Sequence, residues 1–208
     1  MIQNPIPWPN GARCACAITF DMDADSLIHI SRPKDSHDRL YPITMGRYGP
    51  TVGIPRILDT YARLGIKQSF FIPAWCIEQY PGAVDAILKG GHEIGHHGYI
   101  HEDPIETKGE AQEKAFLRAL DIPLKRIGKK PRGYRAPVYN ITQQVIDLLI
   151  AHGFKYESSL MADDIPDEIL KNRDHSKAIP PLYGALLKNE QDVHLLERLA
   201  FMHRRETR

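Results

Sequence analysis

Hydrophobic residues in the first 160 positions form short blocks that alternate with stretches of helical spacing. Apolar blocks short enough for buried strands lie at residues 12–20, 69–73, 92–95, 133–135 and 154–158. Apolar residues recur every three or four positions at residues 52–64, 82–89, 107–127 and 142–152. Strands that alternate with helices in this way predict an α/β fold, with a parallel sheet or barrel at the centre and the helices outside.

Residue types at the ends of these stretches indicate where the helices begin and end. Thr51 and Thr142 stand directly before helical stretches and can act as N-caps. Gly65 and Gly153 follow the same two stretches, as expected at helix C-termini. Pro123 lies inside the third predicted helix, which it must kink or break.

Two further stretches show neither pattern. Residues 26–50 carry charges, Pro and Gly, and we expect a long loop there. Residues 165–208 contain two helix-like stretches and no strong strand, so we expect a helical or irregular tail. A chain of 208 residues is sized for one domain. The prediction is therefore one domain at residues 1–164, followed by this tail.

Composition and charge narrow the class of protein. The 27 Lys and Arg residues nearly balance the 26 Asp and Glu residues, which argues against a basic nucleic-acid-binding face. Three Cys residues do not make a disulfide framework. No apolar run approaches the ~20 residues of a membrane-spanning helix, and the first residues show no signal-peptide pattern. We expect a cytoplasmic protein without membrane or nucleic-acid partners.

Chemically active side chains follow three of the predicted strands. Asp21 and Asp23 come after the first strand, His97 and His101 after the third, and Arg135 ends the fourth. Active groups project from the carboxyl ends of parallel strands, so these residues are candidates for one site. One carboxylate with two imidazoles is a familiar set of ligands for zinc or a related divalent ion.

Taken separately, these signals are weak. If His97 and His101 lay on one helical turn, both rings would face the same way. His92 and His96 have the same spacing, however, in a chain with 10 His residues. An Asp at a strand end is often only a turn residue or a helix cap.

The combination of motifs resembles a known family. Residues 19–23 (TFDMD), 91–101 (GHEIGHHGYIH) and 135–139 (RAPVY) are similar, in order and spacing, to the three motifs of the polysaccharide deacetylases, carbohydrate esterase family 4 with a NodB-type homology domain. Residues 47–53 (RYGPTVG) and 156–161 (YESSLM) resemble the subgroup that includes peptidoglycan-deacetylase-like proteins and allantoinases. The resemblance covers residues 7–165 and implies a distorted (β/α) barrel with a catalytic domain at 1–164, incomplete at its C-terminus.

This resemblance implies a role for each site residue. Asp23, His97 and His101 would hold Zn²⁺ or another divalent ion such as Co²⁺. Asp21 would be the base that takes a proton from the attacking water. Arg135 would position Asp21 by a charge-assisted hydrogen bond, which also favours its ionised form.

Two tyrosines would face the substrate by the same resemblance. Tyr139 belongs to the third motif and would shape the pocket, although an ordinary core aromatic is an equal alternative. Tyr48 belongs to the subgroup segment and would contact the substrate. The first motif departs from the common family pattern because Met22 separates its acids, and Asp25 is a substitute ligand.

The larger departure is the tail. The family's late motif, which supplies a histidine as general acid, has no match among His175, His194 and His203. A barrel without its last strands would expose edges that a second copy of the chain could cover.

The resemblance implies a metal-dependent hydrolase of amide C–N bonds that removes acyl groups from N-acetylated sugars. Two alternatives stay open at this point. One is hydrolysis of a small cyclic amide, imide or ureide, as in allantoinase-like relatives. The other is a truncated, catalytically impaired metal-binding protein.

Overall fold

The protein is an α/β structure built on five parallel strands. The computed structural model describes residues 17–160, so the tail and the domain boundary at 164 lie outside the described residues. The strands are β1 (Thr19–Asp21), β2 (Ser69–Ile72), β3 (Glu93–His96), β4 (Gly133–Tyr134) and β5 (Tyr156–Glu157). They lie side by side in sequence order, and every neighbouring pair is parallel. The predicted fold class is confirmed.

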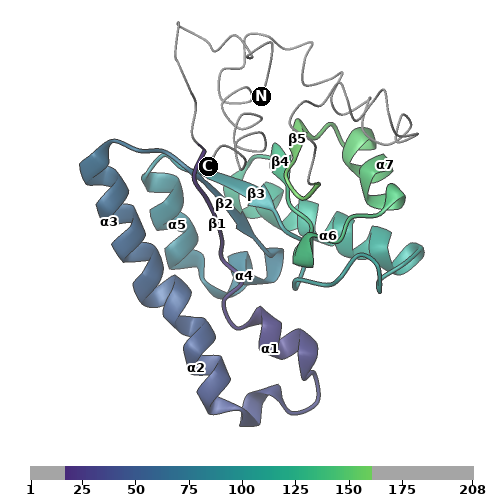
Figure 1. Cartoon of the computed structure of the whole chain (residues 1–208), viewed down its shortest axis with the longest axis horizontal. Helices are drawn as coiled ribbons and strands as arrows, with labels where there is room; N and C mark the ends of the chain where they lie inside the picture. Colours follow the sequence, from purple (N-terminus) through teal and green to yellow (C-terminus); the bar gives the residue numbers. More distant parts are fainter. Residues whose placement is uncertain (1–16, 161–208) are drawn as a thin grey trace, which may run out of the picture.

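Helices connect these strands and cover the outside of the sheet (Figure 1). They are α1 (Ser26–Ser31), α2 (Leu40–Tyr48), α3 (Ile54–Leu64), α4 (Ala74–Gln79), α5 (Pro81–Lys89), α6 (Glu110–Ile127) and α7 (Gln143–Ala151). Short 3₁₀ turns occur at η2 (Ser36–Asp38) and η4 (Pro137–Tyr139). α3 packs beside α5, and α6 packs beside α7.

The predicted loop at residues 26–50 is wrong. That stretch forms α1, η2 and α2, and α2 runs through the π-helical turn η3 (Gly49–Gly53) into α3. Thr51 therefore lies inside a continuous helical segment, where its hydroxyl donates to the Arg47 carbonyl and caps nothing. Pro and Gly in this stretch suggested a break, but the π-helical turn accommodates them within the helix.

The other predicted helix ends agree better with the structure. Thr142 is the N-cap of α7, because its side-chain oxygen accepts a hydrogen bond from the Val145 N–H at 3.4 Å. Gly65 ends α3 in the left-handed conformation. Pro123 lies inside α6 and does not end it. α6 begins at Glu110, three residues after the predicted start.

The two faces of the sheet carry different kinds of side chain. Outward-facing side chains such as Phe70 and Ile94 join the hydrophobic core beneath α3, α4 and α5. On the opposite face, Asp21, Phe71 and Tyr156 lie in one row across the sheet. Gly133 leaves room for the Tyr156 ring in that row, since a Cβ there would lie 1.9 Å from the ring. Alternation along β1 therefore turns Asp21 toward the inside of the fold.

His96 belongs to the outer core, although it stands next to a candidate metal ligand. Its ring stacks on Phe116 at 4.8 Å between centroids and lies 5.2 Å from Tyr134. Its Nδ1 accepts a hydrogen bond from the Gly98 N–H, so its Nε2 carries the proton and faces the Phe116 carbonyl. Both ring nitrogens are engaged, which excludes the His92/His96 pairing as the metal-binding register.

The buried His96 predicts a pH-dependent stability. Burial lowers the pKa of His96 from 6.5 to about 4. Between pH 6.5 and pH 4, this residue therefore binds a proton in the unfolded chain but not in the folded chain. Stability should therefore fall as the pH drops through this window, by up to about 1.4 kcal/mol per pH unit from this residue. Urea unfolding of wild type and His96→Phe at several pH values measures the difference. If the free energies of unfolding of the two proteins changed equally between pH 6.5 and pH 4, the prediction would be contradicted.

Among the described residues, no helix combines the length and the hydrophobicity required to cross a lipid bilayer.

Candidate metal centre

Two carboxylates and two imidazoles meet at the carboxyl ends of β1 and β3. His97 Nε2 lies 3.4 Å from Asp23 Oδ1, and His101 Nε2 lies 3.7 Å from Asp23 Oδ2. One ligand atom from each of these three residues lies within 4.8 Å of the others. Among the described residues, this is the one group of three or more His, Cys, Asp and Glu with such spacing. The structure thus brings together the three residues predicted as ligands.

The donor atoms of this cluster fit a divalent ion. His97 Nδ1 lies 2.7 Å from the Arg135 carbonyl oxygen, so Nδ1 carries the proton and Nε2 presents its lone pair to Asp23. His97 Nε2 and Asp23 Oδ1 are both buried without a hydrogen-bond partner among the described residues. Two buried acceptors facing one another are unfavourable without a shared cation or proton. A metal ion would satisfy both.

The segment between the two histidines is a loop, which corrects the interpretation of their spacing as a helical turn. Gly98 has φ 72° and His101 has φ 68°, both in the left-handed region. A Cβ on Gly98 would lie 3.0 Å from Pro137 and 3.1 Å from Glu102. Backbone shape, and not helical periodicity, therefore brings the His101 ring within 5.0 Å of the His97 ring.

Glu102 holds this loop in shape. Its carboxylate accepts hydrogen bonds from the Tyr99 N–H at 2.8 Å and from the Ile100 N–H at 2.7 Å. The side chain is buried although it is charged, so these backbone donors are its compensation. Glu102 was not predicted from the sequence, where its only signal is an acid directly after the motif histidine.

Removal of the Glu102 carboxylate should weaken metal binding. Glu102→Ala leaves two N–H groups unpaired and frees His101 to move, so we expect a loss of about 10- to 100-fold in metal affinity. Titration against a chelating dye measures this affinity. Glu106→Ala, an exposed acid on the same loop, is the matched control and should bind as wild type does. An unchanged affinity in Glu102→Ala would contradict the assignment.

Burial dominates the protonation behaviour of the cluster. It raises the pKa of Asp23 to about 7, with a further upward contribution from the Asp21 charge. Burial also raises the pKa of Asp21, and the Arg135 guanidinium opposes this rise without cancelling it. Burial lowers the pKa of His97 to about 3, which keeps its imidazole neutral and able to bind a metal. The Arg135 guanidinium therefore favours the ionised form of Asp21, as the resemblance implied, but burial has the larger effect.

Arg135 connects the base candidate to the rest of the sheet. Its Nη1 donates to Asp21 Oδ1 at 2.5 Å, as predicted, and its Nη2 donates to the Thr19 hydroxyl at 2.9 Å. Its Nε donates to the Ser158 hydroxyl at 3.0 Å, and its guanidinium lies over the Phe71 ring at 4.2 Å. Four fixed contacts hold a side chain that is 9% exposed. Arg135 is thus a rigid positioning group for Asp21.

A comparison with protein families agrees with this geometry. The family model for polysaccharide deacetylase matches residues 47–157, which is more than half of the 208-residue chain. The chain belongs to the polysaccharide deacetylase family.

Three relatives of this deacetylase family member illustrate the match. A peptidoglycan deacetylase of Helicobacter pylori is 32% identical over 147 residues, which are 71% of this chain and 50% of that protein. A polysaccharide deacetylase structure from Mycobacterium smegmatis superposes with a TM-score of 0.72 at 36% identity, covering 76% of this chain and 55% of that one. The structure of Puue allantoinase superposes with a TM-score of 0.63 at 22% identity, covering 78% and 60%.

These numbers set the limits of the likeness. The chain spans about half the length of the curated relatives that it matches. At 22% identity, the likeness to the allantoinase shows a shared fold only. The described fold is what this chain has in common with these solved structures.

The two predicted substrate-facing tyrosines occupy different places in this deacetylase domain. Tyr139 has φ 58° and is half-exposed, and its ring lies 6.0 Å from the Arg135 guanidinium carbon. Tyr139 therefore lies near Arg135, and its role in shaping the pocket stays a prediction. Tyr48 is half-exposed on α2, and its hydroxyl accepts a hydrogen bond from Arg56 at 2.8 Å. Its substrate contact stays a prediction.

Asp25 is not a substitute metal ligand. Its carboxylate accepts hydrogen bonds from Arg47 and Tyr80. Cys76 is buried and donates to the Asp23 carbonyl oxygen at 3.1 Å, so it supports the backbone of the ligand. Cys14, Cys16, His175, His194 and His203 lie outside the described residues.

Proposed function

We propose that the protein is a metal-dependent hydrolase that removes acetyl groups from N-acetylated amino sugars. The observation that carries this proposal is the Asp23–His97–His101 cluster beside an Arg135-held Asp21. The family match and the peptidoglycan deacetylase of Helicobacter pylori support the choice of an N-acetyl sugar as substrate.

Asp23, His97 and His101 would hold the ion, which would polarise the amide carbonyl as a Lewis acid and favour a water nucleophile at neutral pH. Nitrogen and carboxylate ligands suit Zn²⁺, and Co²⁺ is the second choice. The ion's identity is part of the proposal.

The chain's own residues would organise the proton transfer. Asp21 Oδ1 is occupied by the Arg135 guanidinium, whereas Asp21 Oδ2 faces the cluster at 3.9 Å from His97 Nε2. We infer that Oδ2 accepts the proton of the attacking water. A base works best when its pKa approaches the working pH, and burial moves the pKa of Asp21 in that direction. Tyr139 would limit the space beside Asp21.

The test is hydrolysis by protein supplied with Zn²⁺, measured as acetate release from the acetylated sugars and as loss of the intact ring from the cyclic substrates. Acetylated chito-oligosaccharides and peptidoglycan fragments form one set of substrates, and allantoin with a cyclic imide forms the other. Turnover of the sugar set alone is the expected result. Turnover of the cyclic set alone would replace the proposal with an allantoinase-like activity. Stoichiometric metal binding without turnover of either set would leave only a metal-binding role.

The cytoplasmic location and an assembly of several copies also stay proposals. Cell fractionation and light scattering, respectively, test them.

A further inference from the structure

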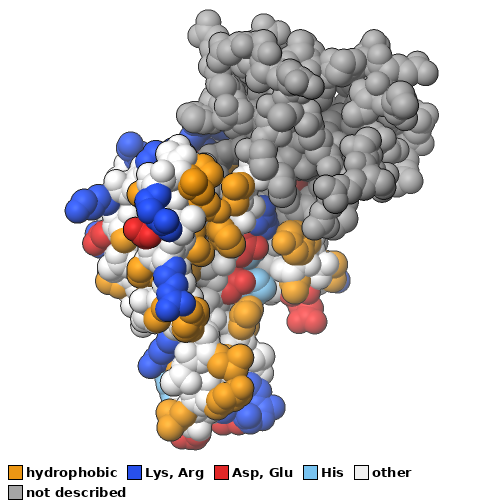
Figure 2. Space-filling view, turned by 60° about the vertical axis from the view of Figure 1, so that its left-hand side comes forward, with side chains coloured by type: hydrophobic (Ala, Val, Ile, Leu, Met, Phe, Trp, Pro, Cys, Tyr) orange, Lys and Arg blue, Asp and Glu red, His pale blue; other side chains and the backbone are white. Residues whose placement is uncertain are grey.

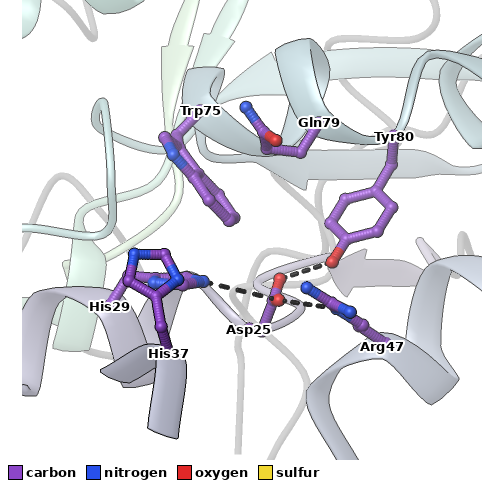
Figure 3. A pocket seen from close by; sticks show the side chains of 7 residues that line it. All are labelled: Asp25, His29, His37, Arg47, Trp75, Gln79 and Tyr80. Carbon is purple, nitrogen blue, oxygen red and sulfur yellow. Dashed lines mark hydrogen bonds and ion pairs between the residues drawn. The ribbon is translucent and has the colours of Figure 1, made fainter. Parts of the chain in front are cut away.

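A cavity lies between α4 and the α1–α2 region (Figure 3). Its volume is about 350 Å³, which is within the usual range of small-molecule sites. His29, His37 and Arg47 line it from one side, and Trp75 and Gln79 from the other. None of these residues belongs to the candidate metal centre.

The floor of this cavity is a carboxylate whose acceptor positions are filled. Asp25 is 1% exposed, and its Oδ1 accepts a hydrogen bond from the Tyr80 hydroxyl at 2.5 Å. Its Oδ2 accepts one from Arg47 Nε at 3.1 Å and lies 3.5 Å from His29 Nε2. Asp25 is thus held from three sides, and it does not need a ligand of its own.

The groups that remain free in the cavity are mainly donors. Arg47 bonds Asp25 through Nε, and its side chain is still 56% exposed, so much of the guanidinium faces the open space. The indole N–H of Trp75 and the amide of Gln79 have no hydrogen-bond partner among the described residues. The side chain of His37 likewise has none there. A guanidinium with further donors suits a carboxylate, which accepts hydrogen bonds and carries the opposite charge.

One wall of the cavity is aromatic. Trp75 lies 4.9 Å from the His29 ring between centroids, and Tyr80 also lines the cavity. Flat apolar surface next to hydrogen-bond donors suits a ring that has both an apolar face and polar edges. A sugar ring has these properties.

The cavity and the metal cluster share their supporting segments. The backbone N–H of Trp75 donates a hydrogen bond to the backbone carbonyl of Tyr99 at 2.7 Å, and Tyr99 lies within the loop that joins the two histidine ligands. Asp25 follows the ligand Asp23 by two residues. On the face of the molecule shown in Figure 2, acidic and histidine side chains lie next to one another. The cavity is therefore connected to the candidate metal centre through two backbone segments.

We propose that this cavity binds the carboxylate of a sugar acid, with Arg47 as the partner of the carboxylate and Trp75 against the sugar ring. The assignment of this sugar acid to the substrate rests on the proposed function. Binding itself does not require turnover and is measured separately.

Fluorescence of Trp75 reports on binding directly. The chain has two Trp residues, so Trp8→Phe leaves Trp75 as the only one. N-acetylmuramic acid and N-acetylglucosamine form a matched pair of probes, because they differ only by the lactyl group that carries the carboxylate. We expect the acid to bind at least about tenfold more tightly. Equal binding of the two sugars, or no response to either, would overturn the inference.

A double variant tests the role of Arg47 without leaving a buried charge unpaired. Asp25→Asn combined with Arg47→Gln removes both charges and should abolish the preference for the acid. Asp59→Asn combined with Arg63→Gln removes an exposed ion pair from α3 and should keep the preference. Thermal unfolding followed by circular dichroism shows whether both variants are folded. A folded Asp25/Arg47 variant that still prefers the acid would refute the role of Arg47.

Two further results separate this inference from other outcomes. Free lactate should compete poorly, and competition as strong as that of the sugar acid would contradict the contact with a sugar. A protein that binds the sugar acid and releases no acetate would contradict the proposed function alone. A protein that releases acetate without preferring the acid would contradict this inference alone.

Discussion

His97→Ala is expected to purify without its metal. The substitution removes the one ligand nitrogen of the cluster that is both buried and fixed by a backbone carbonyl, through the 2.7 Å bond from Nδ1 to Arg135. Two remaining ligands hold a divalent ion poorly. Elemental analysis should therefore fall from about one ion per wild-type chain to near zero. Hydrolysis should fall to the background rate because the Lewis acid is lost.

His92→Gln is the control for this loss, since His92 belongs to the alternative pair at the same spacing. His92 Nδ1 accepts a hydrogen bond from the Gln68 N–H at 3.2 Å, and the residue is not part of the cluster. The His92 variant should keep its ion. If His97→Ala kept a full complement of metal while folded, the ligand assignment would be wrong.

Asp21→Asn is expected to keep its metal and lose activity. Asn offers an oxygen to the Arg135 guanidinium, so the local hydrogen bond survives, but the amide does not accept a proton. General-base catalysis is worth about 10²–10⁴ in rate, and kcat should fall by this factor. Steady-state kinetics and elemental analysis on the same sample separate the loss of the base from a loss of the ion.

The comparison variant is Asp59→Asn, which neutralises an exposed carboxylate on α3. It should have the wild-type kcat. Retention of most of the activity in Asp21→Asn would place the base elsewhere, and loss of the metal in this variant would make Asp21 a ligand.

The sequence by itself predicted the order of the strands and the three residues that form the candidate metal cluster. Alternation of short apolar blocks with helical spacing predicted the parallel sheet, because a buried strand and an amphipathic helix each bury a regular set of positions. Asp21 is the last residue of β1, Asp23 lies two residues beyond it, and His97 directly follows β3. The rule that active groups gather at strand carboxyl ends therefore placed them together. Their order and spacing also carried the family resemblance.

Local patterns failed where helices are held by contacts that are distant in sequence. Residues 26–50 looked like a loop because of their Pro and Gly, yet α2 is held by the bond from Arg47 to Asp25, 22 residues away. The π-helical turn that joins α2 to α3 also has no clear signal in the residues themselves.

The tertiary structure alone decided how the site is supported. Arg135 reaches Asp21 across 114 residues and Thr19 across 116, and periodicity along the chain does not report such pairs. The carboxylate of Glu102 shapes the ligand loop, and the cavity around Arg47 and Trp75 joins α2 to α4. The sequence determined which residues stand at the strand ends, because buried positions recur at regular intervals along each strand and helix. Folding determined their partners, because hydrogen bonds and ion pairs depend on distance in space.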